Sequence, residues 1–242
     1  ILGKMMNGLP GLFAGMAVGV VISVIVAFLV GLPTLRLKGD YLAIATLGVA
    51  EIIRVAVTNM KITNGAAGIS GVPLTNTWTI TYIALVVTTI LILNYTFSSA
   101  GRATYAVLQD EIAAESMGVQ VTKYKILAFV LGAATASIGG TLSATTLGAV
   151  TPSDFTFMKS IEVLIIVVFG GIGSFTGSFV AAVLLGIINL VLQPFGQLRM
   201  IIYAVALILI MIFRPGGLLG TWEFKLGDFK FSKKKETKES GK

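Results

Sequence analysis

The ionisable side chains that could take part in chemistry fall into two small groups. Glu51 and Arg54 stand three residues apart inside an apolar stretch, whereas Asp110, Glu111 and Glu115 belong to the polar stretch 101–125. The 242 residues include no Cys and no His. Thiolate nucleophiles, disulfides, imidazole bases, haem axial histidines and ordinary zinc sites are therefore excluded together. The residue types argue against an enzyme.

Nucleotide chemistry is not indicated either. A phosphate-cradling loop needs Gly, four residues, Gly-Lys and then Ser or Thr, and no Gly-Lys in this chain is followed by a hydroxyl residue. We therefore expect no cofactor in this chain, with any ATP bound elsewhere. The net charge of +7 and the three consecutive lysines 233–235 could suggest nucleic acid. A disordered basic tail over 221–242, lying at an anionic membrane surface, is the simpler interpretation.

The stretch 101–125 predicts one compact element. Asp110, Glu111 and Glu115 stand early in a short helical pattern, where the helix dipole favours negative charge, and Gly118 supplies a left-handed stop. The result is a helix of about two turns, too short to be stable alone in water. We expect its flanking segments to hold it as a peg that docks into a partner protein. A solvated loop helix is the plainer alternative.

The rest of the chain reads as an all-α integral membrane protein. Hydrophobic residues make up 55%, charged residues 12%, and the mean hydropathy is +0.93. We predict a polytopic bundle of about six to seven transmembrane helices in one permease domain over residues 1–220. The segment 160–170 is shorter than a minimal span, so it either crosses or forms a re-entrant half-helix before the glycine-rich break at 170–174. The predicted spans and half-span cover residues 11–32, 41–58, 78–97, 126–147, 160–170, the arm after 174, and 200–213.

Basic residues predict the orientation. If 101–125 faces the cytoplasm, thirteen Lys and Arg lie on that side and four on the other, with Arg54 in the membrane. This bias obeys the positive-inside rule. The stretch 101–125 and the tail are therefore both predicted to be cytoplasmic.

The residues also carry a resemblance to a known family. The sequence Glu-Ile-Ala-Ala-Glu-Ser-Met-Gly at 111–118, followed by Val-Thr-Lys-Tyr-Lys at 121–125, resembles the coupling loop of bacterial ABC importer permeases. The likeness extends to the LivM-type permease subunits of branched-chain amino-acid importers. It is carried by residues 39–48, 51–54, 68–73, 153–162, 170–174 and 213–220. The general permease motif has Glu-Ala-Ala, three residues, then Gly, whereas here Ile112 takes the first position and the acid is Glu111.

The resemblance implies a multi-pass subunit of the bacterial inner membrane that imports leucine, isoleucine and valine. It implies a sister permease, two cytoplasmic ATPase subunits that bind ATP and Mg, and an extracytoplasmic substrate-binding protein. The residues expected to dock on the ATPase are Glu111, Ala113, Ala114, Glu115 and Gly118. The family's amino-terminal region is absent, and the chain opens on Ile1, so we expect a fragment. Urea, short amides or other amino acids are compatible substrates, and a self-contained channel or secondary transporter is the alternative of another class.

Glu51 and Arg54 share a helix face and are expected near mid-membrane, where an isolated charge is costly. One interpretation makes them a self-neutralising pair that stabilises the bundle. The other makes them line the pathway or meet the ammonium and carboxylate groups of the substrate. We favour the first.

Overall fold

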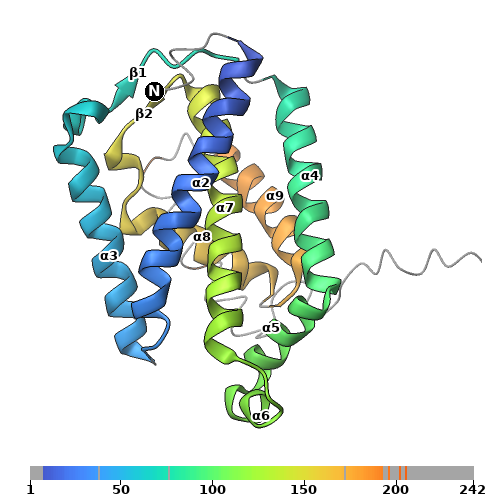
Figure 1. Ribbon diagram of the computed structural model, residues 1–242. Coiled ribbons are helices and arrows are strands. Elements are labelled where there is room, and N and C mark those ends of the chain that lie inside the picture. The colour runs from blue at the N-terminus through green and yellow to red at the C-terminus, as the bar shows by residue number, and fades with distance from the viewer. Residues whose placement is uncertain are drawn as a thin grey trace, which may run out of the picture. The chain divides into compact units, whose positions relative to one another are not determined.

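The computed structural model describes residues 8–37, 39–75, 77–171 and 173–192, together with Gly196, Ile202 and Val205. Most of this part of the chain is helical (Figure 1). The helices are α2 (Leu9–Thr34), α3 (Asp40–Asn59), α4 (Trp78–Phe97), α5 (Ser99–Gln109), α6 (Glu111–Ser116), α7 (Val121–Leu147), α8 (Phe157–Gly170) and α9 (Phe175–Leu192). The shorter elements are η1 (Lys61–Thr63), η2 (Gly65–Ala67), η3 (Pro152–Asp154), β1 (Ile69–Ser70) and β2 (Ala149–Val150).

The structure confirms an all-α polytopic membrane protein. Within the described residues, five helices are long and apolar enough to cross a bilayer, namely α2, α3, α4, α7 and α9. Helix α8 has 14 residues, so it is about 21 Å long against a hydrocarbon core of about 30 Å. It is therefore shorter than a minimal span, as its sequence predicts. The predicted span 200–213 and the tail 221–242 lie outside the described residues, apart from Ile202 and Val205.

The chain divides into two compact units, and the boundary in the sequence falls between Phe157 and Met158. In the first unit, α2 and α7 form the main helix–helix contact. Small residues bring them together, since a methyl group added at Gly19 would lie 3.1 Å from the Ser137 hydroxyl oxygen. The Ser23 hydroxyl donates a hydrogen bond across this contact to the Ala133 carbonyl at 2.9 Å. This helix pair is the frame of the unit.

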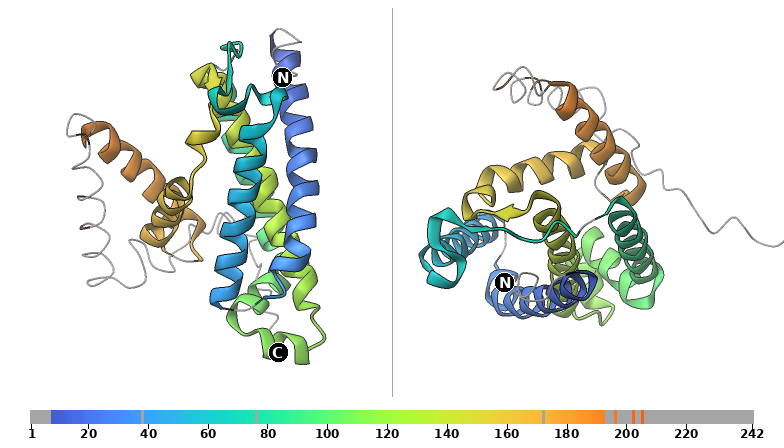
Figure 2. Two further views of the ribbon diagram at one scale, coloured as in Figure 1. Left: turned by 90° about the vertical axis from the view of Figure 1, so that its left-hand side faces the viewer. Right: turned by 90° about the horizontal axis from the view of Figure 1, so that it is seen from above.

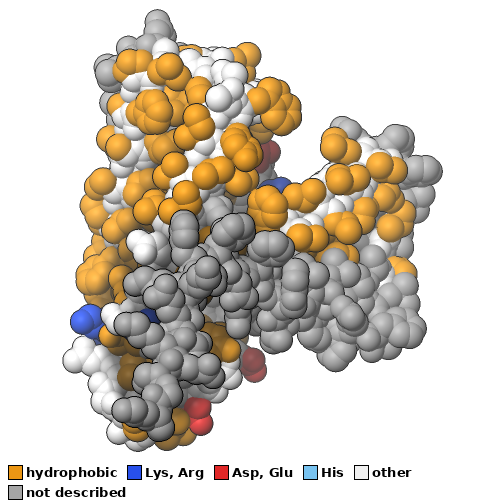
Figure 3. Space-filling view, turned by 90° about the vertical axis from the view of Figure 1, so that its right-hand side faces the viewer, with side chains coloured by type: hydrophobic (Ala, Val, Ile, Leu, Met, Phe, Trp, Pro, Cys, Tyr) orange, Lys and Arg blue, Asp and Glu red, His pale blue; other side chains and the backbone are white. Residues whose placement is uncertain are grey.

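Helices α3 and α4 carry no buried residue and touch the α2–α7 pair only at its margins. Their sides expose large apolar residues, and Figure 3 shows one face on which hydrophobic side chains cover much of the described surface. A helix that is apolar on several sides suits lipid or another membrane subunit. These faces therefore fit a chain that lies in a bilayer.

The spans of the first unit alternate in direction and so define two ends (Figures 1 and 2). We call them the α6 end, which carries the α2–α3 connection, α5 and α6, and the β end, which carries β1 and β2. At the β end, β1 pairs antiparallel with β2 through Ile69 with Val150 and Ser70 with Ala149. Two-residue strands leave no alternating pattern, so the sequence did not predict them.

The second unit contains the hairpin of α8 and α9. Phe169, Ala181 and Leu185 are buried between these helices. A methyl group at Gly170 would overlap the backbone at Gly177, so glycine allows the two helices to touch at the turn. Gly173 has a φ of 93° in that turn. The predicted glycine-rich break at 170–174 is thereby confirmed.

Candidate functional site

A sharp corner leads from the membrane helix α4 into the polar stretch. The Ser98 side chain caps α5 by accepting a hydrogen bond from the Gly101 backbone N–H at 3.1 Å. A methyl group at Gly101 would overlap carbonyl oxygens of the last turns of α4, so the corner requires glycine. The Tyr95 and Thr104 hydroxyls, 2.7 Å apart, join the two helices. Helix α5 is therefore fixed against α4.

Helix α5 was not predicted. A single short helix was expected in residues 101–125, whereas α5, α6 and the start of α7 occupy most of that stretch. Ser98 was the available signal, because Ser is a preferred residue at a helix N-cap. The structure buries Val107 of α5, with only 5% of its surface exposed.

The predicted peg helix is α6, and Asp110 caps its start. The Asp110 Oδ1 atom accepts hydrogen bonds from the backbone N–H groups of Ile112 at 2.8 Å and Ala113 at 3.0 Å. These are two of the N–H groups that a helix start leaves without a partner, and the carboxylate also suits the positive end of the helix dipole. A helix of six residues thereby keeps a defined start.

The end of α6 depends on Gly118. This residue has a φ of 82°, and its N–H donates to the Glu115 carbonyl at 2.9 Å. The next N–H, of Val119, donates to the Ala114 carbonyl at 3.0 Å. This pair of bonds is the Schellman arrangement, which satisfies the last carbonyls and turns the chain out of the helix. The sequence-based expectation of a left-handed stop at Gly118 is confirmed.

The five residues expected to dock differ in how exposed they are. Ala113, Glu115 and Gly118 are exposed at the α6 end. Ala114 is only 5% exposed, so its side chain lies on the inner side of this short helix. Docking by these five residues stays a prediction.

Glu111 is engaged within its own chain. Its carboxylate forms an ion pair with the Lys125 ammonium group, in the first turns of α7. The two side chains are 41% and 24% exposed, respectively. This ion pair joins α6 to α7. It was not predicted, because Glu111 was expected to contact another protein.

Four large apolar or aromatic side chains are exposed in this region, and the sequence did not single them out. Ile112 is 79% exposed and Met117 is 83% exposed, and on α5 Tyr105 and Leu108 are 59% and 62% exposed. We call these four residues the apolar docking set. The sequence could have pointed to them, because they are large apolar side chains within a polar stretch. Exposed groups of this kind are common in protein interfaces.

The predicted pair on α3 is observed. Arg54 Nε donates to Glu51 Oε2 at 2.9 Å, and a second contact joins the other guanidinium and carboxylate atoms. The Glu51 side chain is 54% exposed and that of Arg54 is 29% exposed within this chain. The two groups therefore neutralise each other on a face that the chain itself does not cover. Their role stays a prediction.

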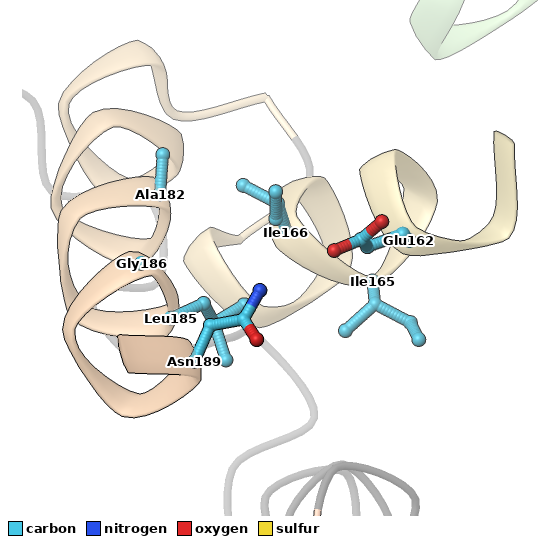
Figure 4. A pocket seen from close by; sticks show the side chains of 7 residues that line it. All are labelled: Glu162, Ile165, Ile166, Ala182, Leu185, Gly186 and Asn189. Atoms are coloured by element: carbon cyan, nitrogen blue, oxygen red, sulfur yellow. The ribbon is translucent and has the colours of Figure 1, made fainter. Parts of the chain in front are cut away.

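A small pocket lies between α8 and α9 in the second unit. Glu162 and Asn189 bring polar groups to it among aliphatic neighbours such as Ile166 and Leu185 (Figure 4). Its volume is about 110 Å³, and Lys159 Nζ lies 2.8 Å from the Glu162 carboxylate. Ligand pockets usually measure about 300–1,000 Å³. This pocket is therefore smaller than usual ligand pockets.

Comparison with known proteins places these features in a family. Residues 2–213 match the family described as the branched-chain amino acid transport system permease component. The LivM permease protein of Salmonella typhimurium is 37% identical over 233 residues, which cover 82% of this chain and 55% of the relative. The LivH permease protein of Escherichia coli is 30% identical over 145 residues, covering 59% and 46%. The chain thus spans about half the length of the LivM relative from Salmonella. No solved structure matches.

Proposed function

The chain belongs to the family of branched-chain amino acid transport permease components, and we propose that it is a membrane subunit of an ATP-driven importer of leucine, isoleucine and valine. The observation that carries this proposal is the family match over residues 2–213. The five apolar helices long enough to cross a bilayer support it. We propose that the sister permease, two ATPase subunits and an extracytoplasmic binding protein complete the transporter.

The proposed site of contact with an ATPase subunit is α6 with the apolar docking set. This chain lacks a phosphate-cradling loop, so ATP and Mg would be bound by the partner subunits. Ile112 and Met117 would fill an apolar groove of the partner, while Ala113 leaves room for close approach and Glu115 faces basic residues. Gly118 would act indirectly, by fixing where α6 ends.

The proposed orientation places the α6 end in the cytoplasm of a bacterial cell, with the protein in the inner membrane. Among the described residues of the first unit, Arg36, Arg102, Lys123 and Lys125 belong to the α6 end, and Lys61 belongs to the β end. Short loops rich in Lys and Arg stay inside during membrane insertion. The β end would then face the binding protein.

A pair of matched substitutions tests the docking surface. Ile112 and Ile62 are the same residue type, 79% and 74% exposed, at opposite ends of the unit. Ile112→Asp should abolish co-purification of the ATPase subunits and leucine uptake, because it places a charge in an apolar contact. Ile62→Asp should retain the ATPase subunits. Equal retention in both variants would refute docking through α6.

The orientation has its own test, because the chain contains no cysteine. A thiol introduced by Ile62→Cys should react with a membrane-impermeant reagent in intact cells. A thiol introduced by Ile112→Cys should react only after the membrane is permeabilised. The opposite pattern would overturn the proposed orientation.

A self-contained channel or secondary transporter is the alternative of another class. Such proteins favour ionisable residues along their spans. Within the described spans, Glu51 and Arg54 are the ionisable pair away from the helix ends. Uptake by the reconstituted transporter should therefore stop when ATP hydrolysis stops.

A competition panel with leucine, urea, acetamide and lysine would decide between the branched-chain amino acids and the alternative substrates.

We propose that Glu51 and Arg54 form a neutralising pair that stabilises the bundle. Removing one partner would leave an uncompensated charge at membrane depth, which is costly. Glu51→Gln should then reduce the amount of inserted protein. Normal protein with lost transport would instead assign the pair to the solute pathway.

A further inference from the structure

A cavity of about 780 Å³ in the first unit lies beside the contact between α2 and α7. On α2 its lining runs from Gly11 to Ser23, which is about 18 Å along the helix axis. At the β end it reaches Ile69, Val150 and Phe155. The cavity therefore extends from the end opposite α6 over more than half of a hydrocarbon core of about 30 Å.

The same two helices are in close contact nearer the α6 end. A methyl group added at Gly31 of α2 would lie 3.2 Å from the Phe129 ring of α7. Neither Gly31 nor Phe129 lines the cavity. The space thus lies toward the β end, alongside an α2–α7 contact that is just as close at Gly19 and Ser137 within its lining.

The lining combines aliphatic side chains with hydroxyl oxygens. Thr141 and Thr145, one turn apart on α7, donate to helix carbonyls at 2.9 Å and 3.0 Å, and Ser23 donates to Ala133. Because these hydroxyl hydrogens are engaged, their oxygens remain as acceptors for a donor group. None of the described lining residues is charged. A solute with net charge would find no counter-charge here.

We propose that this α2–α7 cavity is the solute-binding segment of the transport pathway, and that it receives a net-neutral amino acid with an aliphatic side chain from the β end. The inference rests on the proposed function and deepens it. Its volume falls in the range of about 300–1,000 Å³ that small-molecule sites occupy. The ammonium group can donate to the hydroxyl oxygens, while the side chain contacts aliphatic residues such as Val18 and Ile22. Without a fixed ion pair, the site holds solute weakly enough to release it.

Two adjacent glycines of α7 give a matched test. Gly140 lines the cavity, and a Cβ atom added there meets nothing within 4 Å. Gly139 is exposed, does not line the cavity, and also leaves a Cβ atom free. Gly140→Leu therefore places an aliphatic side chain in the cavity without a backbone clash, whereas Gly139→Leu adds the same group to another side of the helix.

The complete transporter with Gly140→Leu should take up leucine roughly tenfold or more slowly, because one excess methylene in an apolar pocket already changes specificity by roughly 10- to 200-fold. The loss should be smaller for alanine than for leucine, and the amount of assembled transporter should be unchanged. Gly139→Leu should transport at the wild-type rate. Equal uptake in the two variants overturns the proposal, as does loss of assembly confined to Gly140→Leu, which would mean that another helix fills the space.

Thiol labelling decides the cavity independently of uptake. Ala144 lines the cavity and its neighbour Ser143 does not. A thiol from Ala144→Cys should react with an impermeant methanethiosulfonate reagent applied at the β end, and excess leucine but not lysine should slow the reaction. A thiol from Ser143→Cys should show no protection. Absence of leucine protection at Ala144→Cys overturns the cavity assignment, whereas a wild-type transporter that imports no branched-chain amino acid overturns the proposed function.

Discussion

Replacing Asp110 by Ala removes the side chain that caps the start of α6. Asp110 is exposed, and its Oδ1 atom holds the N–H groups of Ile112 and Ala113 at 2.8 Å and 3.0 Å. The alanine side chain has no acceptor, so both N–H groups lose this partner. The helix has only six residues, and helices this short depend on caps and flanking contacts.

The size of the effect follows from the cap. Substituting an N-cap residue by Ala costs about 0.5–2 kcal/mol. The Asp110 cap belongs in the upper part of that range, because a carboxylate acceptor strengthens both hydrogen bonds and suits the helix dipole. A loss of about 1–2 kcal/mol changes the local opening equilibrium of α6 by a factor of roughly 5 to 30.

Hydrogen exchange in the purified transporter measures this change directly. The amides of α6 should exchange roughly 5- to 30-fold faster in Asp110→Ala, while the amides of α2 should keep their wild-type rates. Uptake per ATP hydrolysed should fall as well, since an opened peg transmits less of the ATPase motion. ATP hydrolysis itself should persist, because the partner subunits carry that activity in the proposed assembly.

Asp110→Asn is the matched control, since Asn is as good an N-cap residue as Asp. It should restore near-native exchange in α6 and near-native coupling. Equal behaviour of the Ala and Asn variants would refute the role of the cap. Faster exchange with unchanged coupling would retain the cap but refute the idea that an intact α6 transmits motion.

Three further outcomes are expected. Gly101→Ala should cost about 1–3 kcal/mol, because the added methyl group overlaps backbone carbonyls at the α4–α5 corner, and unfolding in SDS should report the loss. Lys125→Met should lower uptake per ATP with little change in stability, since an exposed ion pair with Glu111 contributes only about 0.2–1 kcal/mol, and Lys125→Arg should restore coupling. The hydroxyl of Thr151 and, to a smaller extent, its backbone N–H donate hydrogen bonds to Asp154 and hold the pKa of that carboxyl below the usual 3.8. The resulting stabilisation is complete above pH 3.8 and is lost as the pH falls through the lower pKa of the folded state. The NMR chemical shift of the Thr151 amide should follow this titration, and it should not do so in Asp154→Asn.

Long apolar segments made the membrane helices predictable. The span predicted at 78–97 coincides with α4, and those at 11–32 and 41–58 differ from α2 and α3 by only one or two residues at each end. Absence of charge over about 20 residues leaves few other stable arrangements in a bilayer. The β1–β2 pairing could not be predicted this way, because it joins Ile69 to Val150 across most of the first unit.

The candidate site was predictable where local chemistry decides it. Asp110 at a helix start and Gly118 at a helix end act through their own neighbouring backbone, and the structure has both in those positions. The partner of Glu111 and the burial of Ala114 depend on how α6 folds back on α7. Such contacts join residues that one sequence does not pair, so neither could be predicted from it.

Helix α7 offers a direct physical connection between the docking region and the proposed cavity. It runs without interruption over 27 residues from Val121 to Leu147, which is about 40 Å. Lys125 near its start bonds to Glu111 of α6, and Thr141 and Thr145 near its end line the cavity. A continuous helix transmits displacement along its axis, so movement of α6 need not pass through the loops at the β end. Since α7 also touches α2 at Gly31, a shift of α7 by a few ångströms would change that tight contact and the cavity together, as alternating access requires.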